Sequence, residues 1–328
     1  MMNRRQIVAG SGLALAAGAT GCSSISTHPV LTACDVHRDG YPTVKAVKWI
    51  GEQLATQTSN RLSLRSYPSA QLGAEDDTIV LAQSGVIDMC RVNSAGLNNA
   101  FPLTQPLSMP FVVDGDDHLH AVCDGEVGKT ILQGFEARGL VGLAIYDAGG
   151  RCFYNTHRPV EKPSDLKGMK IRVPQSDVFI DAVAAMGANP TPLTVSAVYS
   201  SLQSRLIDGA ENNWPTFETS RHVEVAKYWS QTKHSYSPEF LLMSKHSYNS
   251  LQPADRDLVR ELARQSVSVM RTAWVKTEAE AKEKALGEGT LAIDVNRAAF
   301  QAACRPAVDA RLTNEDVRAV YTQIRGLA

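Results

Sequence analysis

The chain reads DLKGMKIRVP over residues 165–174 and DGAENN over residues 208–213. The first stretch places Arg172 at the end of a short apolar strand, and the second ends a strand on two amides, Asn212 and Asn213. Ligands of open α/β sheets bind where strands end, and arginine can hold a carboxylate with two parallel hydrogen bonds. An arbitrary arginine is more often a surface salt-bridge partner, but this combination favours a carboxylate-binding site.

The order of these residues resembles the substrate-binding subunits of tripartite ATP-independent periplasmic (TRAP) transporters, the DctP-like family. That family's pattern is Lys-Gly-x-Lys-Ile-Arg, then Gly-Ala-x-Pro, then Leu-Gln and Asp-Gly-x-Glu-Asn. Here the four parts occupy residues 167–172, 187–190, 202–203 and 208–212. The likeness extends from about residue 31 to about residue 285. It implies an α/β, two-lobed periplasmic binding protein (type II-like) with a long helix spanning both lobes.

Composition is consistent with such a receptor. The 328 residues are enough for two domains. A net charge of −1 and a pI of about 6.7 offer no basic face to nucleic acid or an anionic membrane. We expect no nucleic-acid partner and a monomer.

The N-terminus has the pattern of an export signal. Arg4 and Arg5 precede an apolar run over residues 7–19, which is shorter than a membrane span. The paired arginines fit either a twin-arginine or an ordinary secretory signal. Ala19-Thr20-Gly21-Cys22 resembles a lipoprotein cleavage box, with alanine where leucine is usual. Residues 1–21 are therefore predicted to be a signal peptide of a periplasmic protein, and lipidation of Cys22 is left open.

No metal or cofactor site is predicted. Without Cys22 an odd number of cysteines remains, none in metal-ligand spacing, so most are expected to be buried. One disulfide is an alternative that the sequence cannot pair. Nucleotide-binding, nucleophile-elbow and zinc-protease motifs do not occur.

Two segments of similar sequence indicate a repeat. Residues 83–93 read QSGVIDMCRVN and residues 203–213 read QSRLIDGAENN, with Gln, Ser, Ile, Asp and Asn in common. Each copy is typical of a helix end, a turn and a strand that finishes on polar residues. Coincidence is the alternative, but two similar α/β lobes facing one cleft would explain the match.

Apolar runs that alternate with helical periodicity predict largely parallel sheets. Residues 253–287 predict one helix, because a proline starts the segment and no glycine or proline follows until Gly287. At 1.5 Å per residue it would span roughly 50 Å, more than one small lobe. We expect residues 30–148 plus 236–270 to form the first lobe and residues 149–235 plus 271–328 the second.

The resemblance also implies ligand-binding residues in the second lobe. Arg172 is expected to hold the carboxylate, and Arg151 matches a second arginine of many family members. Asn212 falls at the family's Glu-Asn position. Asn213 and Trp214 depart from the common pattern, which has proline there. Asn213 adds an amide, and Trp214 adds an apolar aromatic face for a sugar ring. The alternative is that Trp214 packs in the hydrophobic core.

Further candidates lie in both lobes. Gln175 and Ser176 follow the Arg172 strand, and Arg91 and Asn93 end the strand of the first repeat copy. The remaining two candidates, which end a strand and start a helix, are His37 and Glu75. Glu75 could simply stabilise the start of its helix.

Many of these candidate side chains can form hydrogen bonds with hydroxyl groups, which suits a polyhydroxylated acid as the ligand. The full pattern of residues resembles the hexuronate-binding branch of the family. We expect a receptor that binds D-glucuronate or D-galacturonate and delivers it to TRAP membrane subunits. The alternatives are a receptor for an aldonate or a C4 dicarboxylate, a sensory receptor, and an exported enzyme. The enzyme would need an acid and a base in the cleft, for which Glu75 and His37 are the candidates.

Overall fold

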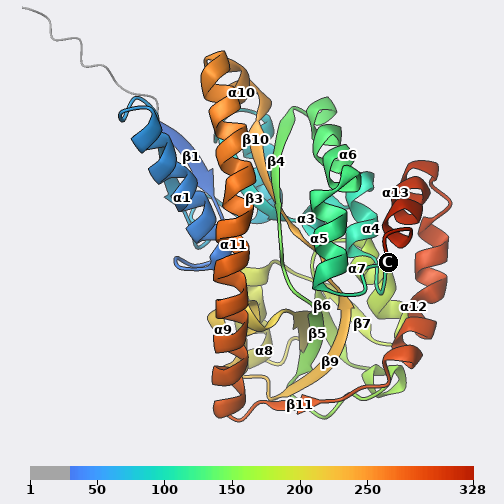
Figure 1. Cartoon of the computed structure of the whole chain (residues 1–328). Helices are drawn as coiled ribbons and strands as arrows, with labels where there is room; N and C mark the ends of the chain where they lie inside the picture. The colour runs from blue at the N-terminus through green and yellow to red at the C-terminus, as the bar shows by residue number, and fades with distance from the viewer. Residues whose placement is uncertain (1–29) are drawn as a thin grey trace, which may run out of the picture.

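The computed structural model describes residues 30–328, which form two α/β lobes (Figure 1). The predicted signal peptide and Cys22 lie outside the described residues. Within residues 30–328, no helix is both long and apolar enough to cross a membrane.

The first lobe contains a five-stranded sheet. Its strands are β1 (Val30–Cys34), β2 (Ser63–Tyr67), β3 (Met89–Asn93), β4 (Leu140–Tyr146) and β10 (Glu239–Ser244). They lie in the order β2-β1-β3-β10-β4. Strand β1 is parallel to β2 and β3, whereas β10 is antiparallel to β3 and β4. All residues of β3, β4 and β10 are buried, which explains why these strands are mostly apolar without alternation.

The second lobe contains a six-stranded sheet. Its strands are β5 (Arg151–Asn155), β6 (Lys170–Val173), β7 (Asn189–Pro192), β8 (Gly209–Asn212), β9 (Tyr228–Ser235) and β11 (Leu291–Ile293). They lie in the order β11-β9-β5-β8-β6-β7. Strand β5 is antiparallel to both β8 and β9, so both sheets are mixed rather than largely parallel. Strands β10 and β5 are antiparallel to their neighbours because the chain has just crossed from the other lobe when it forms each of them.

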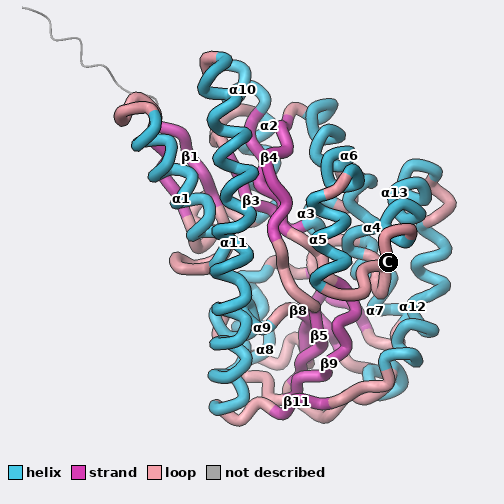
Figure 2. The backbone as a smooth tube through the Cα atoms, in the orientation of Figure 1, coloured by secondary structure: helices cyan, strands magenta, loops and turns pink. Residues whose placement is uncertain are grey.

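Helices cover the faces of both sheets. Four of them belong to the βα units, namely α1 (Pro42–Gln57), α2 (Glu75–Gln83), α7 (Asp177–Ala185) and α8 (Val198–Gln203). The others are α3 (Ser94–Leu97), α4 (Gln105–Ser108), α5 (Asp116–Asp124), α6 (Glu126–Gly134), α9 (Trp214–Thr219), α10 (Lys245–Ser250), α11 (Pro253–Gly287), α12 (Arg297–Arg311) and α13 (Glu315–Arg325). Short 3-10 turns are η1 (Pro102–Thr104), η2 (Phe135–Arg138), η3 (Pro163–Leu166), η4 (Val195–Ala197) and η5 (His222–Glu224). Figure 2 shows the two groups of strands, one for each lobe, with α11 passing beside both.

The predicted repeat is confirmed in backbone detail. Units β1-α1-β2-α2-β3 and β6-α7-β7-α8-β8 share one topology, with the first strand in the centre. The turn after each second helix has a left-handed residue, Gly85 at φ 75° and Arg205 at φ 59°. The aspartate that ends the turn accepts a backbone N–H of the central strand in both copies, Asp88 from Thr32 at 2.7 Å and Asp208 from Lys170 at 2.8 Å. In the first copy the turn extends to Asp88, and strand β3 begins at Met89.

Helix α11 spans both lobes, as predicted. Its first half buries Val259, Leu262 and Met270 against the first lobe. Its second half buries Ala281 and Ala285 in the core of the second lobe. One helix therefore contributes to the hydrophobic cores of both lobes.

The chain passes between the sheets at residues 147–150 and 236–238. The end of the chain differs from the expected division, which put residues 271–328 in the second lobe. Helix α12 packs on α7 of the second lobe, but α13 packs on α4 and α6 of the first. Val317, Val320 and Ile324 of α13 are buried in the first-lobe core, so the last helix returns to the first lobe.

Candidate functional site

Two adjoining cavities lie between the lobes. The inner cavity is lined by Val36, His37, Glu75, Arg91, Asn93, Arg151, Arg172, Pro174, Val195, Asn212, Thr216 and Glu239. The side cavity shares Val36, Glu75, Arg172, Pro174 and Val195 with it and adds residues that include Gln175, Asp76 and Ser196. Their free volumes are about 40 and 50 Å³, room for a few water molecules.

Both repeat copies contribute their strand ends to the inner cavity. Arg91 and Asn93 lie on β3, Arg172 lies on β6, and Asn212 ends β8. Arg151 starts β5, which is antiparallel to β8, so it lies beside Asn212 at the same sheet edge. This is the carboxyl edge of parallel strands, where open α/β sheets bind ligands.

The first lobe lines the cavity with an acidic cluster around one arginine. The buried Arg91 guanidinium donates to Asp35 Oδ1 at 2.5 Å, to Glu75 Oε1 at 2.6 Å and to Glu239 Oε2. Burial raises the pKa of Asp35, but Arg91 and His37 outweigh it and hold that pKa well below its ordinary value. Burial, together with Glu239, raises the pKa of Glu75 above its ordinary value despite Arg91. Three carboxyl groups around one cation leave hydrogen-bond acceptors for ligand hydroxyls.

The second lobe contains a closed arginine–glutamate pair. Arg151 donates to both carboxylate oxygens of Glu211, from Nε at 2.5 Å and from Nη2 at 2.7 Å. Burial raises the pKa of Glu211, but Arg151 reverses this effect and lowers it to about 2. The third nitrogen of Arg151, Nη1, donates to Asn212 Oδ1 at 3.3 Å. The charge of Arg151 is therefore already balanced by Glu211, and the Arg151 guanidinium also orients the side chain of Asn212.

Arg172 is in a different situation. Its Nε and Nη2 donate to the carbonyl oxygen of Leu193 at 2.8 and 2.6 Å, and no carboxylate within residues 30–328 forms an ion pair with it. The side chain is only 4% exposed, and burial lowers its pKa to about 10. A buried charge without a counter-charge is costly. Among the three arginines of the inner cavity, Arg172 is thus the one without a carboxylate partner in residues 30–328.

The structure brings eight of the predicted residues to the two cavities. His37, Glu75, Arg91, Asn93, Arg151, Arg172 and Asn212 line the inner cavity, and Gln175 lines the side cavity. His37 Nδ1 lies 3.0 Å from Asp35 Oδ1, and its ring stacks on Tyr41. Asn93 caps α3 through its Oδ1, as expected for a residue that ends a strand and starts a helix.

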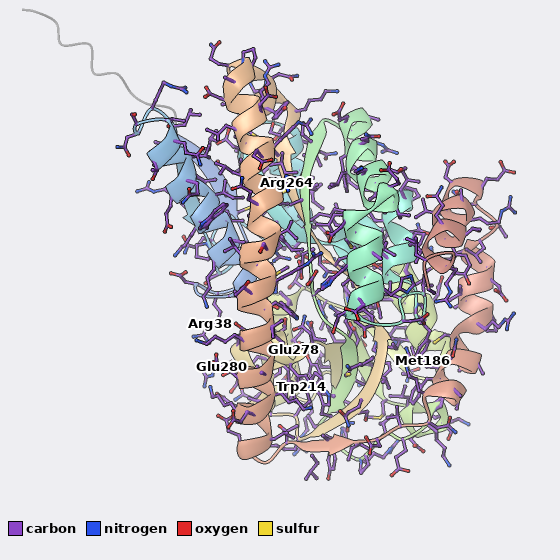
Figure 3. The ribbon with its side chains drawn as sticks, in the orientation of Figure 1. Arg38, Met186, Trp214, Arg264, Glu278 and Glu280 are labelled. Carbon is purple, nitrogen blue, oxygen red and sulfur yellow. The ribbon has the colours of Figure 1, made fainter. Side chains whose placement is uncertain are left out.

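Three predicted residues, Ser176, Asn213 and Trp214, line neither cavity. Asn213 caps α9 by accepting from Thr216 N at 2.8 Å and donates to Ala148 O at 2.8 Å. Trp214, labelled in Figure 3, belongs to the second-lobe core. It stacks on Trp229 with 3.8 Å between ring centroids. Ser176 Oγ hydrogen-bonds the side-chain amide of Asn98 across the lobes at 2.9 Å. Ligand contacts of these three residues stay predictions.

Sequence reasoning missed two of the three acidic partners of Arg91. Asp35 directly follows β1, and Glu239 starts the apolar strand FLLM over residues 240–243. The signal for both is an acid next to a fully apolar strand, where an acid is disfavoured unless it is paired. Val36, Pro174 and Val195 were also missed, because single apolar loop residues carry no pattern.

No group of three or more His, Cys, Asp or Glu residues in the described part of the chain is arranged to hold a metal ion. The five described cysteines are free and buried, as expected. Burial raises the pKa of Cys34 to about 12.

Fold and site together define the class: a two-lobed solute receptor with a cleft for a small organic acid. Residues 34–314 match the model of DctP, bacterial extracellular solute-binding protein, family 7. The chain therefore belongs to the DctP family, and its members' role as solute-binding proteins confirms the prediction of a receptor rather than an enzyme.

Individual relatives agree with this assignment. A solute-binding protein of Chromohalobacter salexigens is 35% identical over 276 residues, 84% of this chain and 82% of that protein. A TRAP periplasmic solute-binding protein of a Bradyrhizobium species, solved with D-galacturonate, has a TM-score of 0.89 and 41% identity over 91% of this chain and 100% of that one. One from Citrobacter koseri, solved with D-glucuronate, has a TM-score of 0.87 and 36% identity over 90% and 98%. The chain is a periplasmic solute-binding protein of the TRAP type.

Proposed function

We propose that this protein binds a hexuronate, D-galacturonate or D-glucuronate, between its lobes, with the carboxylate on Arg172. The observation that carries the proposal is the charge state of the three cleft arginines. Arg91 and Arg151 have buried carboxylate partners, whereas Arg172 has none within residues 30–328. A ligand carboxylate would supply the missing counter-charge and accept from the unused Nη1.

The rest of the cleft suits the hydroxyls of a sugar. Glu75 and Glu239 are acceptors beside the cavity, and His37 can donate or accept. The side-chain Oδ1 of Asn212 accepts from Arg151 Nη1 and from Asn213 N. Its Nδ2 group donates to no other described residue and could donate to a ligand hydroxyl. Relatives solved with hexuronates support the same ligand class.

Both lobes would contact the ligand, which would therefore favour the closed arrangement over the open one. The closed receptor would then deliver the uronate to TRAP membrane subunits. We further propose that the protein acts as a monomer and that residues 1–21 are the signal peptide that directs its export. Lipidation of Cys22 is left open.

Isothermal titration calorimetry against D-galacturonate, D-glucuronate, D-gluconate and succinate tests the ligand. We expect stoichiometric binding of a uronate, with gluconate and succinate weaker by at least tenfold. Preference for gluconate or succinate would assign the protein to one of the alternative ligand classes. Chemical conversion of the bound uronate, read by NMR, would contradict a receptor.

A further inference from the structure

A third cavity adjoins the other two on the solvent side. This outer pocket has a volume of about 240 Å³, several times that of either inner space. It shares Val36 and Val195 with both other cavities and His37 with the inner cavity. The two valines, one from each lobe, thus stand between the outer pocket and the predicted carboxylate site.

Both lobes form the walls of the outer pocket. His37, Arg38 and Ser69 come from the first lobe, and Tyr199, Ser220 and His222 come from the second. Arg38 Nη1 donates to the carbonyl oxygen of Thr219 at 2.9 Å, which joins the walls across the lobes. Figure 3 shows Arg38 at the level where the two lobes meet. A ligand in this pocket would therefore bridge the lobes as one in the inner cavity does.

Two residues that line the outer pocket, His222 and Arg38, have a nitrogen without a hydrogen-bond partner and a charge without an ion-pair partner, respectively. His222 is 1% exposed, its Nδ1 lies 2.7 Å from Tyr154 Oη, and its buried Nε2 has no hydrogen-bond partner. Burial lowers the pKa of His222 to about 3, so the ring is neutral at neutral pH. Arg38 forms no ion pair with a carboxylate of residues 30–328. A buried polar atom without a partner is rare in proteins and needs an explanation.

Tyr199 adds an aromatic wall. Its hydroxyl donates to Glu224 Oε2 at 3.0 Å, and Arg221 lies over its ring at 5.4 Å from the centroid. These contacts fix the ring beside the pocket, where it can present an apolar surface at little entropic cost. Aromatic ring, neutral imidazole, hydroxyls and one cation make up a lining suited to a sugar with an acid group.

We infer that the outer pocket is a second sugar subsite and that the ligand class includes a disaccharide of two uronates. One unit would lie in the inner cavity with its carboxylate on Arg172. The other would lie past Val36 and Val195, against Tyr199, with its carboxylate near Arg38. This inference rests on the proposed function, because it places the first unit in the uronate site.

Calorimetry with D-galacturonate and α-1,4-linked digalacturonate tests the subsite. The wild-type protein is expected to bind the disaccharide at least as tightly as the monosaccharide. Ser220→Trp fills the outer pocket and should weaken the disaccharide more than tenfold while leaving the monosaccharide within about twofold. Tyr199→Ala should weaken the disaccharide alone, by roughly threefold to tenfold. Thermal unfolding of each variant identifies any loss of fold.

The outcomes separate this inference from the proposed function. If D-galacturonate binds and digalacturonate does not, the outer pocket is only a solvent passage and the subsite is refuted while the uronate receptor stands. Equal losses for both ligands in Tyr199→Ala would also refute a separate subsite. If the disaccharide binds and neither monosaccharide does, the subsite stands and the monosaccharide assignment is wrong. If no uronate binds, both are refuted.

Discussion

Arg151 and Glu211 face each other on neighbouring strands and share two hydrogen bonds of 2.5 and 2.7 Å, with both side chains buried. Because this pair is closed, it cannot neutralise Arg172, which lies on the same sheet two strands away from β5. The two arginines therefore have different predicted roles: Arg151 stabilises the lobe, and Arg172 binds.

Arg172→Ala should abolish most uronate binding. Removing one partner of a buried ion pair costs about 3–5 kcal/mol, which corresponds to a loss of affinity of roughly a hundredfold to several thousandfold. Calorimetry measures it directly. Arg264→Ala is the matched control, since Arg264 is an exposed residue of α11 that pairs with Glu261 (Figure 3). Retained affinity in Arg172→Ala would remove Arg172 from the site.

Arg151→Ala should instead lower stability. It leaves Glu211 buried without a counter-charge, at a cost of about 3–5 kcal/mol in the free energy of unfolding. Urea denaturation followed by circular dichroism measures this change. The double variant Arg151→Met/Glu211→Leu should recover most of the loss, because no unpaired charge remains. If the double variant is as unstable as the single one, packing of the arginine rather than charge balance explains the effect.

Stability should fall in mild acid partly through His222. Its pKa is about 3 in the folded protein against an ordinary 6.5, with burial as the main cause. Below pH 6.5 the unfolded chain therefore binds a proton that the folded protein does not, and stability decreases as the pH falls towards 3. His222→Gln, which cannot titrate, should show a shallower decline between pH 6.5 and 4 in urea denaturation. Above pH 7 the two proteins should show the same pH dependence, and parallel curves at all pH values would contradict the assignment.

Gly149→Ala should disturb the crossing between the lobes. Gly149 has φ 61°, and a Cβ there would lie 2.8 Å from Trp274 Cζ2 and 2.9 Å from Glu278 Oε1 on α11. Gly168→Ala is the control, because Gly168 has φ 81° but nothing within 4 Å of a Cβ. Both variants strain the backbone by roughly 1 kcal/mol, and Gly149→Ala should lose clearly more stability and also uronate affinity. Equal melting temperatures of the two variants would mean that Trp274 and Glu278 of α11 move away from the added Cβ without a loss of stability.

The sequence predicted the parts of this fold that have local patterns. The bounds of α11 agree with the predicted segment, residues 253–287, because a proline starts it and the next glycine ends it. The return of α13 to the first lobe was not predictable, since any amphipathic helix can cover either lobe. Its position depends on which apolar surface the preceding elements leave uncovered.

The site was predictable to the extent that the repeat was visible. Arg91 and Arg172 were found because each lies on a strand end with a recognisable neighbourhood. Glu239 was missed because its pairing with Arg91 joins residues far apart in the chain. The side chain of Asn213 caps α9 and donates to Ala148 O, two contacts that the sequence pattern did not indicate. Its contact with a ligand stays a prediction.

The unequal charges of the two cleft walls also imply a filter on ligand shape. A linear diacid whose first carboxylate lies on Arg172 would place its second towards Glu75 and Glu239, where like charges repel it. A sugar acid of similar length presents neutral hydroxyls at that position and meets only acceptors. If Arg172 binds the carboxylate as proposed, we expect the acidic cluster around Arg91 to disfavour short dicarboxylates and to orient an entering acid with its carboxylate towards the second lobe.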